Sequence, residues 1–193
     1  IKYAEKFGDL VSFARKIDKN IGNGSQFSTA VLKNYFKLMA YKDEYEVSRL
    51  MTNKKFVDDV NKNFEGNFNY NFYLAPPIFS KKSKVDGKLL KVKFGGWLFN
   101  VFKLLSKFKF LRGTRLDPFG YLNERKKERE LIRDYKETIT DIGIKINKSN
   151  YETAVKIASI PDQIRGFGHV KEKNIKEAIN YRTDLLNSFH ENT

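Results

Sequence analysis

The 193-residue sequence contains no cysteine. A disulfide framework, a thiolate zinc site, an iron–sulfur cluster and a cysteine nucleophile are therefore excluded from this chain. Proline is also scarce, at 4 residues, and glycine numbers 12, which excludes a collagen-like or low-complexity chain. The 2 histidines do not have H-x-x-x-H spacing, so we expect no histidine-based metal site.

Long hydrophobic runs are missing as well. The most apolar stretch, residues 94–110, is interrupted by lysines and other polar residues, and no run reaches the roughly 20 residues that a membrane-spanning helix needs. The charged N-terminal residues do not resemble a signal peptide. We therefore expect a cytoplasmic chain without a membrane span. Because residue 1 is Ile and not Met, we also expect a fragment of a larger protein.

Positive charge and aromatic residues are abundant. Lys and Arg total 37 and Asp and Glu 23, for a net charge of +14, and hydrophobic residues make up 40% of the chain. This apolar content is enough for a core and excludes a disordered polybasic tail. The excess charge is concentrated in residues 81–109, a lysine-rich stretch that suits nucleic acid, an anionic membrane or an acidic ferredoxin. A solvated lysine face is the alternative, and frequent Lys, Asn, Ile and Phe is also typical of an AT-rich genome.

Apolar residues recur at helical spacing through most of the chain, which predicts a mainly α domain of about six helices. The predicted helices cover about 2–17, 28–50, a short piece near 56–60, 97–108, 122–142, 150–160 and 170–189. Ser149 and Glu152 match the S-x-x-E capping box and predict a helix start there. Alternating residues at about 68–74 and 89–94 predict a short β-hairpin insertion. With no long linker, we expect a single domain over 1–193, in which 1–25 form an N-terminal helix and turn.

Six strings of unusual composition follow one another in the sequence. They are Met39–Val47 with Arg49 and Leu50; Leu74–Pro77; Phe94 and Gly95 with Trp97; Leu111–Thr114 with Leu116–Gly120; Glu124 and Arg125; and Ile164–Lys171. Together they resemble the C-terminal domain, itself of unknown function, of the fused indolepyruvate ferredoxin oxidoreductases. Those enzymes belong to the 2-oxoacid:ferredoxin oxidoreductase superfamily. The resemblance covers about residues 30–190.

The resemblance implies a parent enzyme with thiamine diphosphate, Mg and iron–sulfur clusters. Such an enzyme decarboxylates an aryl 2-oxoacid, transfers the acyl group to coenzyme A and passes electrons to ferredoxin. This chain has neither cluster-ligating cysteines nor a glycine-rich phosphate loop. We therefore expect an accessory, non-catalytic domain that packs against the catalytic domains and supports assembly or covers the active-site entrance. A basic nucleic-acid-binding module and a domain that binds coenzyme A or another polyanion stay open as alternatives.

One candidate interface lies in the first of these strings. Its residues are Tyr41, Lys42, Asp43, Glu44, Tyr45, Glu46 and Arg49. On a helix, the pairs Lys42–Glu46 and Glu46–Arg49 would be close enough for ion pairing. The predicted role is an inter-domain or subunit contact, and the alternative is a solvated helix face with local ion pairs.

Two further strings carry candidate contacts for an anion or for another domain. The first has Arg112, Thr114 and Asp117 in a turn, where an arginine beside a glycine suits phosphate or carboxylate. The alternative is an Asp117 turn or cap with Arg112 or Arg115 as a structural partner. The second has Arg165, His169 and Lys171 before an expected helix N-terminus. Its alternative is a Gly166 C-cap, a Phe167 core anchor and a capping His169.

Trp97 stands among several phenylalanines in the predicted helix 97–108. Such a cluster can stack on nucleic-acid bases or face a membrane. At helical spacing, a stripe in the core or at a domain interface is the favoured interpretation.

Overall fold

The computed structural model describes residues 2–66, 68–74, 90–166 and 168–192. Within them the chain forms eight α-helices, two short 3-10 helices and one pair of strands. The prediction of a mainly α fold with a short β-hairpin is confirmed. The chain divides into two compact units: unit 1 comprises residues 1–41 and 127–193, and unit 2 comprises residues 42–126. The single domain over 1–193 stays a prediction, because this division concerns packing only.

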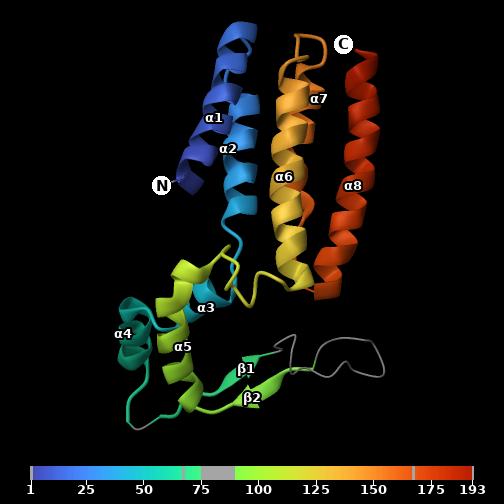
Figure 1. Ribbon diagram of the computed structural model, residues 1–193. Coiled ribbons are helices and arrows are strands. Elements are labelled where there is room, and N and C mark those ends of the chain that lie inside the picture. Colours follow the sequence, from blue (N-terminus) through green and yellow to red (C-terminus); the bar gives the residue numbers. More distant parts are fainter. Residues whose placement is uncertain (1, 67, 75–89, 167, 193) are drawn as a thin grey trace. The chain divides into compact units, whose positions relative to one another are not determined.

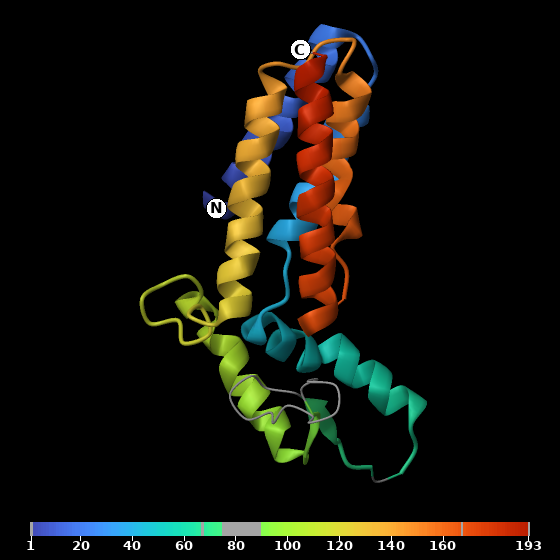
Figure 2. The same cartoon turned by 90° about the vertical axis from the view of Figure 1, so that its right-hand side faces the viewer.

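Unit 1 is a bundle of five helices, and unit 2 lies in the sequence between the second and the third of them. They are α1 (Lys2–Ile21), α2 (Gln26–Met39), α6 (Asn123–Gly143, of which residues 127–143 belong to unit 1), α7 (Tyr151–Ser159) and α8 (Gly168–Glu191). A 3-10 turn, η2 (Ile160–Gln163), follows α7 and contains Pro161. These helices run side by side in both views (Figures 1 and 2).

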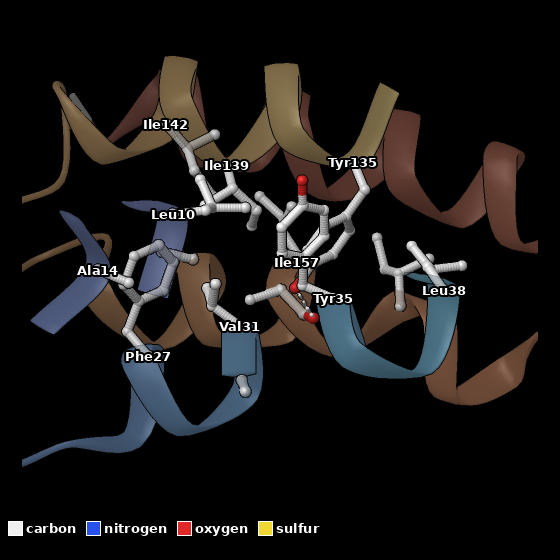
Figure 3. Packing of buried hydrophobic residues seen from close by; sticks show 14 of the residues in the cluster. Leu10, Ala14, Phe27, Val31, Tyr35, Leu38, Tyr135, Ile139, Ile142 and Ile157 are labelled. Carbon is white, nitrogen blue, oxygen red and sulfur yellow. Dashed lines mark hydrogen bonds between the residues drawn. The ribbon is translucent and has the colours of Figure 1, made fainter. Parts of the chain in front are cut away.

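A single apolar cluster fills unit 1. On α2, Phe27, Val31 and Tyr35 repeat every four residues and are at most 1% exposed. They face Ile139 of α6 and Ile157 of α7 (Figure 3). The Tyr35 ring also stacks on that of Tyr135, with centroids 5.9 Å apart. The helical periodicity of the sequence therefore corresponds to one continuous core.

The C-terminal end of α6 lies very close to α1. A Cβ atom on Gly143 would stand 2.5 Å from Phe13 Cε1 and 2.8 Å from Ile17 Cδ1. Glycine is therefore the residue that fits at this position without moving the neighbouring side chains.

Unit 2 is smaller and has few buried apolar side chains. Its elements are α3 (Glu44–Met51), α4 (Lys54–Asn63), β1 (Phe72–Leu74), β2 (Val92–Phe94), α5 (Trp97–Lys107) and the 3-10 turn η1 (Phe108–Leu111) (Figure 1). The strands are antiparallel, with Phe72 opposite Phe94 and Leu74 opposite Val92. Helix α3 packs against α5. Of the predicted hairpin, residues 75–89 lie outside the described part of the chain.

The predicted helix over 28–50 is wrong in its extent. The structure has two helices here, because α2 ends at Met39 and α3 begins at Glu44. The Asp43 side chain accepts a hydrogen bond from the Glu46 amide at 2.8 Å and caps α3. Helix α2 also begins earlier than expected, at Gln26. The Ser28 amide of its first turn donates to Asp18 Oδ2 at 2.8 Å, so an aspartate from α1 satisfies it.

The capping box predicted at Ser149 does not form. The residue before α7 is Asn150, and its side chain makes no hydrogen bond to the helix amides. Asn150 Oδ1 instead accepts from the Asn147 amide at 2.8 Å. Ser149 Oγ donates to Asn147 Oδ1, so the 147–150 turn uses its polar side chains internally.

Candidate functional site

Asp43 and Arg112 form the centre of a polar network in unit 2. The Asp43 side chain is 5% exposed, and its Oδ1 accepts from Arg112 Nη2 at 2.6 Å. Arg112 Nε lies 2.5 Å from Asp43 Oδ2, so the pair is bidentate. The same carboxylate caps α3 through the Glu46 amide. Arg112, predicted as an anion contact, is thus paired with a carboxylate of this chain.

Asp117 organises the turn that follows η1. Its Oδ2 accepts from the Gly113 amide at 2.9 Å, and its Oδ1 accepts from the Phe119 amide at 3.2 Å. Gly113 has φ +74°, which favours glycine. Thr114 Oγ1 donates to the Leu111 carbonyl at 2.7 Å, within the same turn. Asp117 therefore has the role of a turn residue that the sequence offered as the alternative to an anion contact.

Tyr45 connects this turn to α3. Its hydroxyl donates to Asp117 Oδ1 at 3.2 Å, and its ring meets Phe119 edge to face at 5.2 Å between centroids. The tyrosine is 1% exposed. Burial and the Asp117 carboxylate raise the pKa of Tyr45 to about 12, because both disfavour a phenolate. Tyr45 is therefore a neutral hydrogen-bond donor at physiological pH.

Glu44 and Arg125 connect the two ends of unit 2. Arg125 Nε donates to Glu44 Oε2 at 3.2 Å, and Nη2 donates to Oε1 at 3.3 Å. We call the set Asp43, Glu44, Tyr45, Arg112, Asp117 and Arg125 the α3 network. Its members come from three of the six strings that carry the resemblance.

The remaining candidates of the first string are near this network in the sequence. Arg49 and Glu46 form the predicted i,i+3 pair, at 2.6 Å, and a hydrogen bond from Arg49 lowers the pKa of Glu46. Lys42 is exposed and precedes α3, so the helical Lys42–Glu46 geometry that we expected does not arise. Tyr41 is half-buried and lies in the same segment before α3.

The second predicted anion site lies in unit 1, at the turn between η2 and α8. Arg165 Nε donates to the Asp162 carbonyl at 2.9 Å. Lys171 Nζ lies 2.5 Å from Glu128 Oε1, and His169 is exposed in the first turn of α8. Gly166 has φ +91°, as the glycine-cap alternative requires. Phe167 lies outside the described residues.

Sequence reasoning missed two lysines that approach this turn from α2. Lys33 Nζ lies 3.3 Å from Asp162 Oδ2, and Lys37 Nζ donates to the Pro161 carbonyl at 2.6 Å. Desolvation lowers the pKa of Lys37; Asp162 opposes this, and the charges of Arg165, Lys33 and Lys171 add to it. The i,i+4 spacing of Lys33 and Lys37 is the signal that would have placed both on one face of α2.

A buried polar contact in unit 1 was also missed. Asp18, 3% exposed, accepts from the Tyr151 hydroxyl at 2.7 Å. The same hydroxyl accepts from the Phe27 amide at 3.2 Å. Burial, with this hydrogen bond to Asp18, raises the pKa of Tyr151. The contact joins α1, α2 and α7 and is a structural element of the bundle.

Unit 1 also has a small apolar cavity of about 40 Å³ that is partly open to solvent, and its lining residues include Leu38, Tyr135, Ile157 and Ala178. A cavity that binds benzene is several times larger, about 150 Å³. This cavity is therefore too small for an aryl substrate. In the described part of the chain, no group of three or more His, Asp and Glu side chains is placed to hold a metal ion. No helix there is long and apolar enough to cross a membrane.

The sequence profile of a family of unknown function, DUF6537, matches residues 1–183. The chain belongs to this family. The match covers all of unit 2 with the α3 network, and the bundle of unit 1 as far as residue 183 in α8. Neither the curated proteins nor the solved structures gave a significant match to the chain.

Proposed function

We propose that this DUF6537 chain is an accessory, non-catalytic domain of an indolepyruvate-type 2-oxoacid:ferredoxin oxidoreductase. Its role is to pack against the catalytic domains, where it supports assembly or covers the active-site entrance. In that parent enzyme, thiamine diphosphate, Mg and iron–sulfur clusters supply the chemistry. The absence of cysteine is consistent with clusters bound elsewhere in the polypeptide.

The observation that carries the proposal is the convergence of the resembling strings. Asp43, Glu44 and Tyr45 of the first string meet Arg112, Asp117 and Arg125 of two later ones, through contacts spanning up to 81 residues. Residue types at these positions are tied to one another by bidentate pairs and buried hydrogen bonds. Strings with such mutual constraints are a stronger basis for a resemblance than isolated matches.

The test uses the complete product of the native gene beside the isolated chain. We expect the complete polypeptide to reduce ferredoxin or a dye with an aryl 2-oxoacid, thiamine diphosphate and coenzyme A. The isolated chain should give no turnover. A complete polypeptide without this activity, after its clusters and thiamine diphosphate have been restored, would refute the family assignment. Turnover by the isolated chain would refute the accessory role.

A second candidate function is polyanion binding, for example of coenzyme A, at the turn around Asp162. The supporting observation is that Lys33, Lys37 and Arg165 all contact the Pro161–Asp162 segment. Calorimetric titration with coenzyme A should then give a weaker affinity for Arg165→Ala than for the wild type. Equal affinities would show that coenzyme A is attracted by the overall positive charge and not by a site at this turn.

A further inference from the structure

Helix α5 has an exposed apolar side in addition to its buried one. Trp97, Val101, Leu104 and Phe108 repeat at i, i+4, i+7 and i+11, and so lie on one face of the helix and its continuation into η1. Their exposed fractions are 60%, 42%, 58% and 39%. We call this face the α5 ridge. It is about 16 Å long, from the helical rise per residue.

The α5 ridge is not the face that holds unit 2 together. The buried side chains of α5 are Leu98 and Phe102, each one residue after a ridge position. They therefore lie about 100° around the helix axis from the ridge. Phe102 meets the Phe72 ring edge to face at 5.2 Å. The ridge residues therefore add exposed apolar surface that unit 2 does not use for its own packing. Aromatic residues such as Trp are enriched at the centre of protein–protein interfaces, where they contribute much of the binding energy.

The charge beside the ridge has one sign. Lys103 and Lys107 each precede a ridge residue by one position, so both lie on the flank opposite the buried face. Lys103 Nζ is 4.8 Å from the centroid of the Phe99 ring. No Asp or Glu occurs anywhere in residues 87–116. A surface that covers the ridge therefore gains from carboxylates on the lysine flank.

We infer that the α5 ridge is a docking face for a protein surface with an apolar groove and Asp or Glu residues along one edge. Resting on the proposed function, the inference places that groove in the remainder of the oxidoreductase polypeptide. A ridge-to-ridge contact with a second copy of this chain is disfavoured, because residues 87–116 offer no carboxylate to the other copy's lysines. An anionic membrane is the competing occupant, because lysines beside exposed apolar side chains also suit it, and the vesicle arm of the experiment below distinguishes the two.

Cysteine labelling tests the inference, since the chain has no cysteine of its own. Leu104→Cys places a thiol on the ridge, and Leu32→Cys, at a position 38% exposed on α2, is the matched control. A maleimide is reacted with each variant in the isolated chain and in the complete product of the native gene, and peptides are counted by mass spectrometry. We expect residue 104 to be protected at least roughly tenfold in the complete polypeptide, since interface cores exclude solvent. Residue 32 should react equally in both.

The charged edge has its own variant. Lys107→Glu in the Leu104→Cys background should lower the protection of residue 104, whereas Lys62→Glu, an exposed lysine on α4, should leave it unchanged. Equal effects of the two changes would refute the inference that the partner has Asp or Glu residues beside the lysine flank of the ridge.

The outcomes separate this inference from the proposed function. Oxidoreductase activity without protection of residue 104 overturns the docking face and leaves the proposed function intact. Protection without that activity keeps the docking face and overturns the proposed function. Slow labelling of residue 104 in the isolated chain, or protection that appears with increasing concentration or with phosphatidylglycerol vesicles, assigns the ridge to another occupant and overturns the inference.

Discussion

The two units of this chain are stabilised by different kinds of interaction. Unit 1 buries a cluster of 20 apolar residues contributed by all five of its helices. The buried apolar residues of the described part of unit 2 are Tyr45, Leu98 and Phe102, beside the buried polar residues Asp43, Ser48 and Asp117. Unit 1 therefore depends mainly on apolar burial, whereas unit 2 combines contacts between partly exposed aromatic rings with buried hydrogen bonds and ion pairs.

The largest effect should come from the core of unit 1. Ile139 on α6 is fully buried, and Ile139→Ala should lower the free energy of unfolding by about 3 kcal/mol, through lost burial and the cavity left behind. Ile144→Ala, at a position 71% exposed just after the same helix, should change it by less than about 0.5 kcal/mol. Urea unfolding followed by circular dichroism measures both. Equal effects would contradict a core-dominated unit 1.

An intermediate effect should come from the α3 network. Asp43→Ala removes both the helix cap and the partner of Arg112, and should cost about 2 kcal/mol. Asp43→Asn keeps a capping side chain and loses the charge, so about half of that cost should remain. Hydrogen exchange of the α3 amides localises the change to unit 2. As a control, Arg49→Ala breaks an exposed ion pair and should cost far less than Asp43→Ala.

The smallest effect should come from one hydroxyl group. Tyr45→Phe removes the donor to Asp117 and should cost about 1 kcal/mol at pH 7. Because the pKa of Tyr45 is raised to about 12, the unfolded chain loses this proton first as the pH rises above 10. The contribution of Tyr45 is complete below pH 10 and disappears towards pH 12.

The pH dependence of this contribution has a direct measurement. Denaturant unfolding followed by the fluorescence of Trp97 reports on unit 2, since Trp97 is the single tryptophan. Wild type should lose more stability than Tyr45→Phe between pH 10 and 12. If the free energy of unfolding depended on pH in the same way for both proteins, the pKa of Tyr45 would not be raised by folding.

The elements of unit 1 were largely predictable from the sequence. The apolar positions of α1 and α2, such as Leu10, Ala14 and Val31, follow the helical period, and they are the residues that the core buries. Glycine and asparagine in residues 20–25 also indicated the turn between these helices. Local periodicity and turn chemistry were sufficient because the apolar face of each helix in a bundle is determined by the residue spacing within that helix.

The candidate sites were less predictable, because their partners are distant in sequence. Arg112 was identified as a candidate, but its partner Asp43 lies 69 residues earlier, and Tyr151 meets Asp18 from 133 residues away. No spacing rule encodes such pairs. One local signal was overlooked: Asp43 and Glu46 have the spacing of a capping box, which would have divided the predicted helix over 28–50.

The order of the two units along the chain has a consequence for synthesis. Unit 2 is encoded between α2 and the rest of unit 1, and Glu44 and Arg125 close its two ends. A ribosome therefore completes residues 42–126 before α7 and α8 exist to cover α1 and α2. From the end of α2 at Met39 to the end of α8 at Glu191, synthesis at about 5–20 residues per second takes about 8–30 s, during which the apolar faces of the first two helices are without their partners. Until the rest of unit 1 has been made, helices α1 and α2 should therefore expose apolar side chains that the finished bundle buries.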